Sequence, residues 1–519
     1  MPTRNLGWRR SPVSGKLDAF YPPINPVNSW KIAAPYRLDH VFDMIAVHPR
    51  HNDAGSMAYF KWADTKSEYV CRPSWFGGEP PFRLTLLSAP DGMTIGGGTE
   101  QTFTRTLSAH AGVYTHSLPN DYATIRWQPT DGQHGNTYSV RLLVEDQTGG
   151  YLIFRWSITV DDTKFKYFDA VGGNNANSGS FASPYQTFGY GYASVANAQN
   201  YIYKYKAGTY TIHSGVAEND ASFDASHCRS HIGIETGVIF DCTYGAFSGG
   251  LSDICIMNLK ITGGQPARQN VRQVNLTNRS DRAFINRVEF DTTEGGTQLP
   301  SADNPCGIMF SNITPNWHYN VSISDCTLSA ASVTGMYVLF AVRDSIVENT
   351  YASGINISTS NGDIIGHFKD ACYNVGLRFS DYSGDPTGGV FFVSNQTPSR
   401  ALNSDVNYCR FVTTGSAYGS TIRWNAQVPA LENMPAGQYI QRCSIDSNTV
   451  KPIKMEDSGA GSKVNYSGIL WDSTWATLDG GSTGGQSVGQ TSIKVADINN
   501  LSADDIGKRG WVIASTMVV

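Results

Sequence analysis

Carboxylate side chains are the residues of this sequence that could catalyse a reaction on a polymer. In the segment FINRVEFDTTE (284–294), strand alternation would place Arg287, Glu289 and Asp291 on one face. Hydrolysis of a glycosidic bond needs two carboxyl groups, one protonated as the acid and one ionised as the base or nucleophile. Carboxylates recur in later segments, so the candidate catalytic residues are Glu289, Asp291, Asp344 and Glu348, with Asp325 and Asp381 near corresponding points. The alternative for each is an Asp or Glu that caps a turn or faces solvent.

A second group of residues could bind sugars, because sugar-binding surfaces combine aromatic rings with hydroxyl, amide and charged groups. Such groups gather in NITPNWHYN (312–320), RFSDYSGD (378–385) and IRWNAQ (422–427). A lyase would instead need a base, such as a His or Tyr of these segments, and a cation to neutralise the carboxylate of its substrate. The candidate substrate-binding residues are Trp317, His318, Tyr319, Arg378 and Trp424, unless the tryptophans only cover loop cores.

These residues need a scaffold, and the composition indicates one built of short strands. The chain has 519 residues, 52 of them Gly, and only 16% are charged. Low charge with abundant Gly, Asn, Ser and Thr favours turns and strands over helices, and the length predicts two to four domains. The net charge of −5 does not indicate a nucleic-acid partner, and no window approaches 18 consecutive apolar residues, so we expect no membrane span.

The nine cysteines do not form a metal-binding or disulfide pattern. No CxxC pair is present and the cysteines are widely spread, so we expect no structural zinc and mostly reduced, buried thiols. The basic N-terminus lacks the apolar core of a signal peptide. We therefore expect either a signal removed from the chain or a protein made and kept in the cytoplasm before its release.

We interpret residues 1–65 and 66–162 as two separate units. The first contains Trp8, Trp30, Trp62 and several prolines with weak periodicity, which suits a segment that attaches to a partner or, alternatively, extra strands on the next unit. The second contains alternating strands in FRLTLL, YATIRWQP, YSVRLLVED and YLIFRWSITV, separated by turn clusters. Asp146, Asp161 and Asp162 are favoured as turn caps over calcium ligands.

The second unit resembles the Ig-like, cadherin-like modules of extracellular and phage proteins. The resemblance lies in SAPDGM (88–93), WQPT (127–130) and the closing ITV (158–160). It implies a β-sandwich that serves as a spacer or adhesive unit without chemistry of its own.

The next part of the chain resembles the start of right-handed parallel β-helix proteins of the pectate-lyase-like class. The segment 166–210 has a Gly- and Asn-rich turn, Pro184-Tyr185-Gln186-Thr187, room for a short helix, and strands at 201–205 and 208–210. Because Gly and Asn tolerate positive φ, the segment NNANSGS reads as a tight, ordered turn and not as a linker. The resemblance implies a solenoid over residues 163–477, followed by a C-terminal cap at 478–519.

Short segments of similar texture recur along this region, as expected for stacked coils with loops of variable length. They include CIMNLKITGG, FINRVEFDTT, VSISDCTLSA, VNYCRFVTTG and IQRCSIDSNT. A small or apolar residue at one place in each coil would form an interior ladder, so the cysteines have a packing explanation. The alignment that we predict for this ladder is Cys255, Val288, Cys326, Ser345, Cys372, Cys409 and Cys443.

This domain order resembles a bacteriophage tailspike or tail appendage. The resemblance implies recognition, with or without depolymerisation, of host surface polysaccharide, an N-terminal contact with other virion proteins, and a homotrimer. Two alternatives stay open: a secreted polysaccharide lyase or glycoside hydrolase, and a non-enzymatic bacterial adhesin. We expect no cofactor and no metal, except for calcium in the lyase alternative.

Overall fold

The computed structural model describes only part of the 519-residue chain. The described residues are 8–10, 17–19, 41–49, 58–105, 108–110, 113–115, 118–119, 121–194, 201–212, 230–242, 247–249, 253–262, 272–277, 281–291, 306–311, 318–330, 337–340, 342–354, 364–369, 373–384, 389–395, 404–413, 420–426, 438–441, 443–447, 451–456, 465–467 and 470–471. The predicted cap at 478–519 lies outside them.

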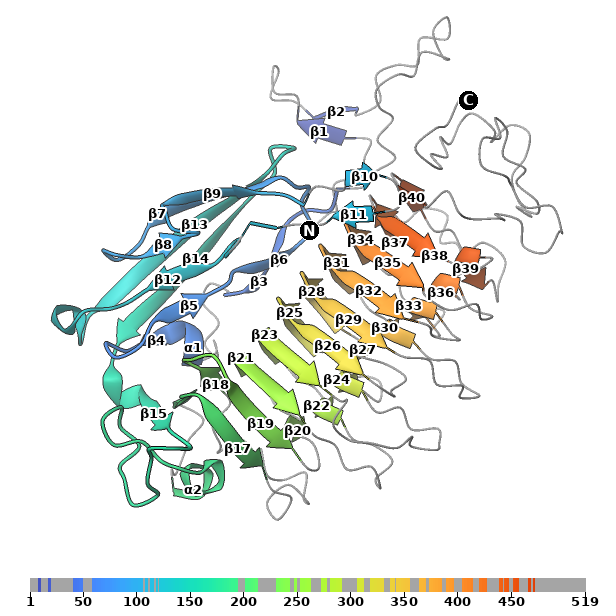
Figure 1. Ribbon diagram of the computed structural model, residues 1–519. Coiled ribbons are helices and arrows are strands. Elements are labelled where there is room, and N and C mark those ends of the chain that lie inside the picture. Colours follow the sequence, from blue (N-terminus) through green and yellow to red (C-terminus); the bar gives the residue numbers. More distant parts are fainter. Residues whose placement is uncertain are drawn as a thin grey trace, which may run out of the picture.

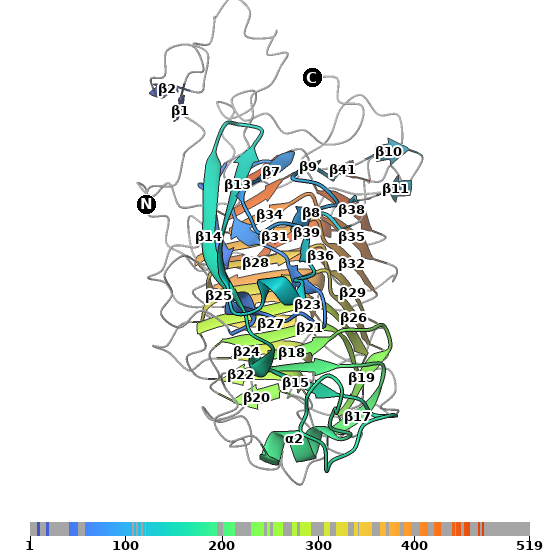
Figure 2. The same cartoon turned by 90° about the vertical axis from the view of Figure 1, so that its left-hand side faces the viewer.

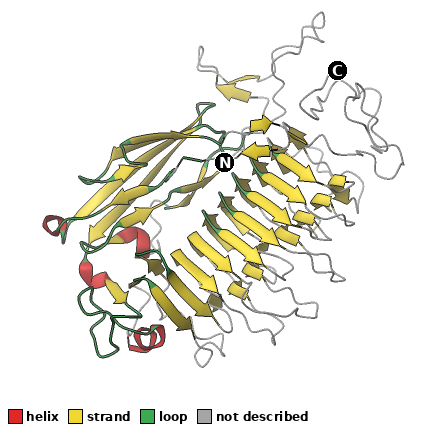
Figure 3. Cartoon of the chain, in the orientation of Figure 1, coloured by secondary structure: helices red, strands yellow, loops and turns green. Residues whose placement is uncertain are grey.

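Strands dominate the described residues, which confirms the expectation of an all-β chain (Figure 3). The helices among the described residues are short: α1 (Ala58–Lys61), α2 (Phe188–Ser194), and the 3-10 turns η2 (Asp131–Gln133) and η3 (Asp162–Lys164). Within this part of the chain, no helix has the length and apolar character needed to cross a membrane.

The N-terminal part contains two largely antiparallel sheets. The larger has the order β4-β14-β13-β7-β9, and the smaller has the order β5-β12-β8. Long strand runs are where the alternating patterns predicted them. The bounds are β4 (Trp62–Ala63), β5 (Tyr69–Cys71), β7 (Phe82–Ser88), β8 (Thr94–Ile95), β9 (Glu100–Phe103), β12 (Ile125–Trp127), β13 (Thr137–Asp146) and β14 (Tyr151–Val160).

The two sheets enclose an apolar core, and we call this unit the sandwich. Every second residue along β13 and β14 points inward, as the sequence alternation requires. Trp75 and Trp127 are fully buried in the core, where the Trp75 ring packs edge-on against Phe82 at 5.1 Å. Alternation along the strands therefore separates this core from the solvent-facing side chains.

Part of the predicted attachment segment packs with the sandwich. The strand β3 (Ile45–His48) pairs with β6 (Ser74–Phe76), and β4 pairs with β14. Residues 41–49 and 58–65 therefore behave as the extra strands of our alternative interpretation. Of residues 1–40, only β1 (Trp8–Arg10) and β2 (Leu17–Ala19) are described, as one antiparallel pair, and β10 (Ser108–His110) with β11 (Val113–Thr115) forms another.

Parallel strands make up most of the remaining described chain, in a 19-stranded and an 8-stranded sheet that we together call the stack. The 19-stranded sheet holds two rows of strands. The first row contains β15 (Phe165–Phe168), β16 (Ile202–Tyr205), β18 (Ser230–Gly233), β21 (Ile254–Thr262), β23 (Asp281–Asp291), β25 (His318–Ser324), β28 (Val342–Glu348), β31 (Tyr373–Arg378), β34 (Ser404–Asn407), β37 (Gln438–Gln441) and β40 (Asn465–Ser467).

The second row continues from the first, and the 8-stranded sheet forms a third. The second contains the C-terminal halves of β21 and β23 with β17 (Gly208–Ile212), β19 (Val238–Cys242), β26 (Thr327–Ala330), β29 (Tyr351–Gly354), β32 (Asp381–Gly384), β35 (Arg410–Thr413), β38 (Ser444–Ser447) and β41 (Leu470–Trp471). The third contains β20 (Phe247–Gly249), β22 (Arg272–Thr277), β24 (Cys306–Ser311), β27 (Tyr337–Phe340), β30 (Ile364–Lys369), β33 (Gly389–Asn395), β36 (Ser420–Ala426) and β39 (Lys451–Glu456). From β25 onward the chain visits the three rows in the same order (Figure 1), and we call one strand from each row, taken in chain order, a coil.

Apolar side chains stack in register within each row. In the first row the partners are Ile256, Ile285, Ile323, Val347, Leu377 and Val406, all buried. In the second row Phe290, Leu328, Tyr382 and Phe411 are also buried, and the Tyr382 and Phe411 rings stack at 5.4 Å. Because parallel strands lie about 4.8 Å apart, each coil buries its apolar residue on that of its neighbour.

The predicted cysteine ladder is partly correct. The register places Val288, Cys326, Thr350, Ser380, Cys409 and Cys443 at one position, just before each second-row strand, and all of them are buried. Cys255 and Ser345 were assigned wrongly, because both lie on first-row strands, and Cys372 is outside the described residues. Burial raises the pKa of the Cys326 thiol to about 12, which fits a packing role.

The Gly- and Asn-rich segment is ordered, as predicted. Phe168 bridges to Tyr185, and the amide oxygen of Asn175 accepts hydrogen bonds from the backbone N–H groups of Gln186 and Thr187 at 3.2 and 3.0 Å. The short helix α2 follows, and then β16. This segment therefore begins the stack.

The sandwich lies against the outer face of the first row, through β3, β6 and α1 (Figures 1 and 2). Phe60 of α1 packs edge-on against Phe284 at 5.2 Å, and the Nε2 atom of His48 is 2.7 Å from the carbonyl oxygen of Asn320. A Cβ on Gly376 would lie 3.3 Å from the Phe76 ring. The sandwich and the first row therefore share one continuous core.

Candidate functional site

The outer face of the second row carries a column of polar or aromatic residues, with one member from each coil. In register these are Lys260, Glu289, Thr327, Tyr351, Asp381 and Arg410. Tyr351 is 44% exposed, whereas most aromatic side chains among the described residues are buried. The sandwich packs on the first row, and in this column of side chains Asp381 also contacts it.

A column of residues with left-handed backbone turns the chain from the first row into the second. The residues are Asn258, Arg287, Asp325, Asn349, Phe379 and Tyr408, with φ between 47° and 56°. Asn and Asp adopt this conformation more readily than other side chains. Asn349 donates a hydrogen bond from Nδ2 to Oδ1 of Asp325 at 2.8 Å, which links two successive coils.

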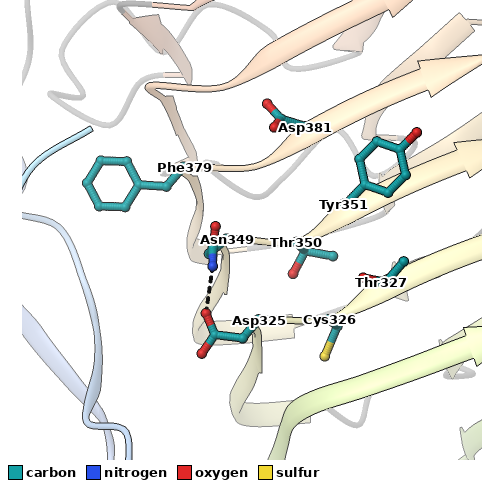
Figure 4. Close-up of a pocket in the computed structure, with 8 residues that line it drawn as sticks. All are labelled: Asp325, Cys326, Thr327, Asn349, Thr350, Tyr351, Phe379 and Asp381. Atoms are coloured by element: carbon teal, nitrogen blue, oxygen red, sulfur yellow. Dashed lines mark hydrogen bonds between the residues drawn. The ribbon is translucent and has the colours of Figure 1, made fainter. Parts of the chain in front are cut away.

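A pocket of about 180 Å³ opens at this corner (Figure 4). The pocket is lined by residues of three successive coils, with the exposed ring of Tyr351 at its edge. The lining residues are Asp325, Cys326, Thr327, Asn349, Thr350, Tyr351, Phe379 and Asp381. The lining residues therefore include carboxylate, amide, hydroxyl and aromatic side chains.

Asp381 contacts an arginine of the sandwich. The Nη2 atom of Arg105 lies 2.7 and 2.8 Å from the two carboxylate oxygens of Asp381, and Nη1 donates to the carbonyl oxygen of Tyr408 at 3.2 Å. Burial raises the pKa of the Asp381 carboxyl, and the charges of Arg105 and Arg410 oppose this rise. Asp381 is the pocket carboxyl that protonates more readily than an ordinary Asp.

Asp325, the other pocket carboxylate, faces a different arginine of the sandwich. Its Oδ2 atom lies 3.0 Å from Nε of the fully buried Arg72 and accepts a hydrogen bond from Asn286 at 2.9 Å. The two carboxylates of the pocket thus have separate cationic partners, both from the sandwich.

Glu348 lies in a buried ion cluster behind the pocket. Its Oε1 is 2.8 Å from Nε of Arg378, and its Oε2 is 2.8 Å from Nη2 of Arg72. Burial acts to raise the pKa of Glu348, but the charges and hydrogen bonds of the two arginines outweigh it and lower that pKa. This glutamate is ionised and enclosed, which favours a structural role over proton transfer to a substrate.

Arg378 also belongs to this cluster and is 4% exposed. It donates to the backbone carbonyl oxygens of Gly77 and Trp75 at 3.1 and 3.3 Å, and its guanidinium lies 4.5 Å from the centre of the Phe82 ring. The predicted substrate-binding arginine therefore faces the sandwich and does not line the pocket.

Glu289 and Asp291 lie on the second row, away from Glu348. Lys260 of the preceding coil pairs with both, at 3.1 Å to Glu289 and 2.8 Å to Asp291. The hydrogen bond that Lys260 donates to Asp291 is the main cause that raises the pKa of Lys260. The structure brings these two predicted carboxylates together but leaves the first-row Glu348 on a different face. Their catalytic role stays a prediction.

Arg287 does not share a face with Glu289 and Asp291, so this part of the expected alternation is wrong. Its left-handed backbone turns its side chain toward the sandwich, where Nη2 lies 3.1 Å from Asp121 and donates to Thr124 at 2.9 Å. Strand alternation does not continue through a residue with this conformation.

The remaining candidates are only partly described. Tyr319 is half-buried on β25, beside Asp281 and Arg343 in the register. Asp344 and His318 lie on β28 and β25, and Trp424 lies on β36 of the third row, but their side chains are outside the described part of the structure. Trp317 is outside it altogether. Their roles stay predictions.

Metal ligands do not cluster in the described part of the chain, where no three His, Cys, Asp or Glu side chains are placed to hold an ion. The sandwich aspartates satisfy backbone donors instead. Oδ1 of Asp146 accepts from the N–H groups of Thr148 and Gly150 at 2.9 and 2.7 Å, and Oδ1 of Asp161 accepts from that of Thr163 at 3.0 Å. These three contacts are turn caps, as we favoured.

Sequence reasoning named Asp325 and Asp381 but missed Tyr351, Asn349 and the sandwich residues Arg72 and Arg105. The available signal was a short repeat, in which a turn residue precedes a buried residue, an outward residue and another buried residue. DCTL, FSDY and YCRF follow it, and so do the first three residues of NTYA. Aligning that repeat would have placed Tyr351 and Asp381 on one outer face, whereas nothing local links Arg105 to Asp381, 276 residues away.

Comparison with known proteins identifies no relative. No family model matches the sequence, and no curated protein and no solved structure matches it.

Proposed function

We infer that this protein is a virion-associated tailspike or tail-fibre-like protein that recognises the surface polysaccharide of a host. In this proposal the stack is a right-handed parallel β-helix, the sandwich is an Ig-like module, and the N-terminal segment contacts other virion proteins. The observation that carries the proposal is the pocket beside Tyr351, on a long face that carries a column of polar and aromatic side chains from successive coils.

The chemistry of the pocket suits a sugar ring. A carbohydrate offers an apolar ring face and several hydroxyl groups, and the pocket offers an exposed aromatic ring next to carboxylate, amide and hydroxyl groups. Its volume of about 180 Å³ is below the roughly 300–1,000 Å³ of pockets for drug-sized ligands, so it would hold one unit of a polymer. Further units would follow the face along the coils.

We expect Tyr351→Ala to weaken binding to the cognate polysaccharide by about tenfold or more, because an aromatic anchor contributes much of the affinity of such a site. The measurement is binding of the full chain to an array of purified bacterial capsular polysaccharides and O-antigens. Tyr151→Ala is the matched control, since Tyr151 is a 66% exposed tyrosine on the sandwich. Equal loss in both variants, or none in Tyr351→Ala, would contradict the assignment of the pocket.

A virion role also predicts a homotrimer. Light scattering should give a native mass of about 170 kDa, three times the 56.5 kDa of one chain. A monomer would contradict the tailspike proposal and favour the secreted enzyme.

A polysaccharide depolymerase is the second candidate, favoured by two carboxyl groups in one pocket with different surroundings. Asp381 has a raised pKa, as a general acid requires, whereas Asp325 faces the charge of Arg72. Size-exclusion analysis of the bound polysaccharide separates the candidates. Chains shortened by the wild type but not by Asp381→Asn would indicate cleavage, and unchanged chains would indicate recognition alone, as in the tailspike or adhesin readings.

A further inference from the structure

We propose that Arg105 is a positioning residue of the pocket, which orients the Asp381 carboxylate for sugar hydroxyl groups and makes the sandwich part of the binding site. This inference rests on the proposed function, because it assumes that the pocket binds a sugar. The sequence alone led us to expect that the sandwich serves only as a spacer or an adhesive unit. The sandwich would instead determine whether the stack can bind.

The position of Arg105 is set by the sandwich core. Arg105 follows β9, whose last residue, Phe103, is 2% exposed. The Phe103 ring lies 4.9 Å from that of Tyr122 and 6.4 Å from that of Phe379, and Phe379 lines the pocket. Aromatic residues of the sandwich thus pack against the wall of the pocket, and they hold the chain that carries Arg105 at its side.

The contact between Arg105 and Asp381 leaves the carboxylate able to bind a ligand. The Arg105 side chain is 3% exposed, whereas that of Asp381 is 32% exposed. An ionised carboxylate has about four acceptor positions, and Nη2 of Arg105 contacts the two oxygens from the buried side. Charge-assisted hydrogen bonds of this kind are shorter and stronger than neutral ones, so the carboxylate is held in one orientation.

Arg105 also affects the charge state of Asp381. The charged or titratable groups around this carboxyl are Arg105 from the sandwich, Arg410 one coil further on, and Tyr351 and Asp325 from the preceding coils. Burial raises the pKa of Asp381, and Arg105 is the first of the opposing charges. Removing Arg105 should raise that pKa further, so that protonation would abolish the acceptor at a higher pH.

The experiment measures binding of the full chain to the same polysaccharide array from about pH 4 to 8, a range that spans ordinary and raised carboxyl pKa values. We expect Arg105→Ala to weaken binding at neutral pH by about tenfold and to move its loss on acidification to higher pH. Arg105→Lys keeps a positive charge and should restore the pH profile in part. Asp381→Asn should bind weakly with no acidic loss.

Arg83→Ala is the matched control, since Arg83 pairs with Glu145 at 3.1 Å on the sandwich surface and is 53% exposed. Wild-type affinity and an unchanged pH profile in Arg105→Ala would overturn the inference. Weaker polysaccharide binding by Tyr351→Ala would still support the pocket as the binding site in that case. If the wild type binds no polysaccharide, the proposed function itself fails. If Arg105→Ala does not fold, the other two variants test the inference. Arg105→Lys should still lose polysaccharide binding at acidic pH, and Asp381→Asn should not.

Discussion

Glu348→Gln is expected to lower the free energy of unfolding by about 3–5 kcal/mol, the usual cost of removing one partner of a buried ion pair. The substitution keeps the volume of the side chain and removes its charge. Arg72 would then keep Asp325 as its described ion-pair partner, and Arg378 would keep its hydrogen bonds to two backbone carbonyl oxygens, with both guanidinium groups still buried. Urea-induced unfolding, followed by intrinsic fluorescence and by circular dichroism, measures the effect.

The surface glutamate Glu145 provides the control for this prediction. It pairs with Arg83 at 3.1 Å, with side chains 39% and 53% exposed, so Glu145→Gln should cost at most about 1 kcal/mol. Equal effects at the two positions would show that the buried cluster does not hold the sandwich on the stack.

The contribution of Glu348 should also depend on pH in a defined direction. Its pKa is lowered in the folded protein, so its stabilising effect is fully present above the ordinary Glu pKa of about 4.3. The effect is lost as the pH falls below that value and through the lower folded-state pKa. The difference in stability between wild type and Glu348→Gln should therefore shrink in acid.

Phe284→Ala is expected to lower the free energy of unfolding by about 3–5 kcal/mol, because it empties a large buried aromatic position. Phe284 is fully buried on the outer face of the first row, 5.2 Å from the Phe60 ring and 5.8 Å from that of His48. The cavity would lie between the sandwich and the stack. Hydrogen exchange should therefore become faster in α1 and β3 as well as in β23.

Phe290→Ala is the matched variant, since Phe290 is equally buried but stacks on Ile261 and Leu328 inside the second row. It should cost a similar free energy and accelerate exchange in the stack, with little change in α1 and β3. Identical exchange patterns for the two variants would be inconsistent with a shared core between the sandwich and the first row.

Local patterns in the sequence predicted much of the architecture. Alternation located β7, β13 and β14, and turn residues located the connections between them. The Gly- and Asn-rich segment before β16 is ordered because its Asn side chains hydrogen-bond to the backbone of its own turn. These features depend on neighbours in sequence, so they can be inferred without a tertiary structure.

The candidate site was predicted less well, because one residue per coil breaks the alternation. Arg287 and Asp325 have left-handed backbone, and the chain changes rows at these residues. Counting every second residue across such a corner assigns side chains to the wrong face, as it did for Arg287. The repeat around the corner was visible in the sequence, but its conformation was not.

The sequence by itself determined an all-β chain, the strands of the sandwich, the ordered start of the stack and a supply of carboxylates. Only the tertiary structure decided which carboxylates lie in the pocket and which are buried. The reason is physical: Glu348 and Asp381 have their surroundings set by Arg72 and Arg105, which are 276 residues away from them in each case. Long-range packing of the sandwich on the first row creates those contacts, and no local pattern encodes them.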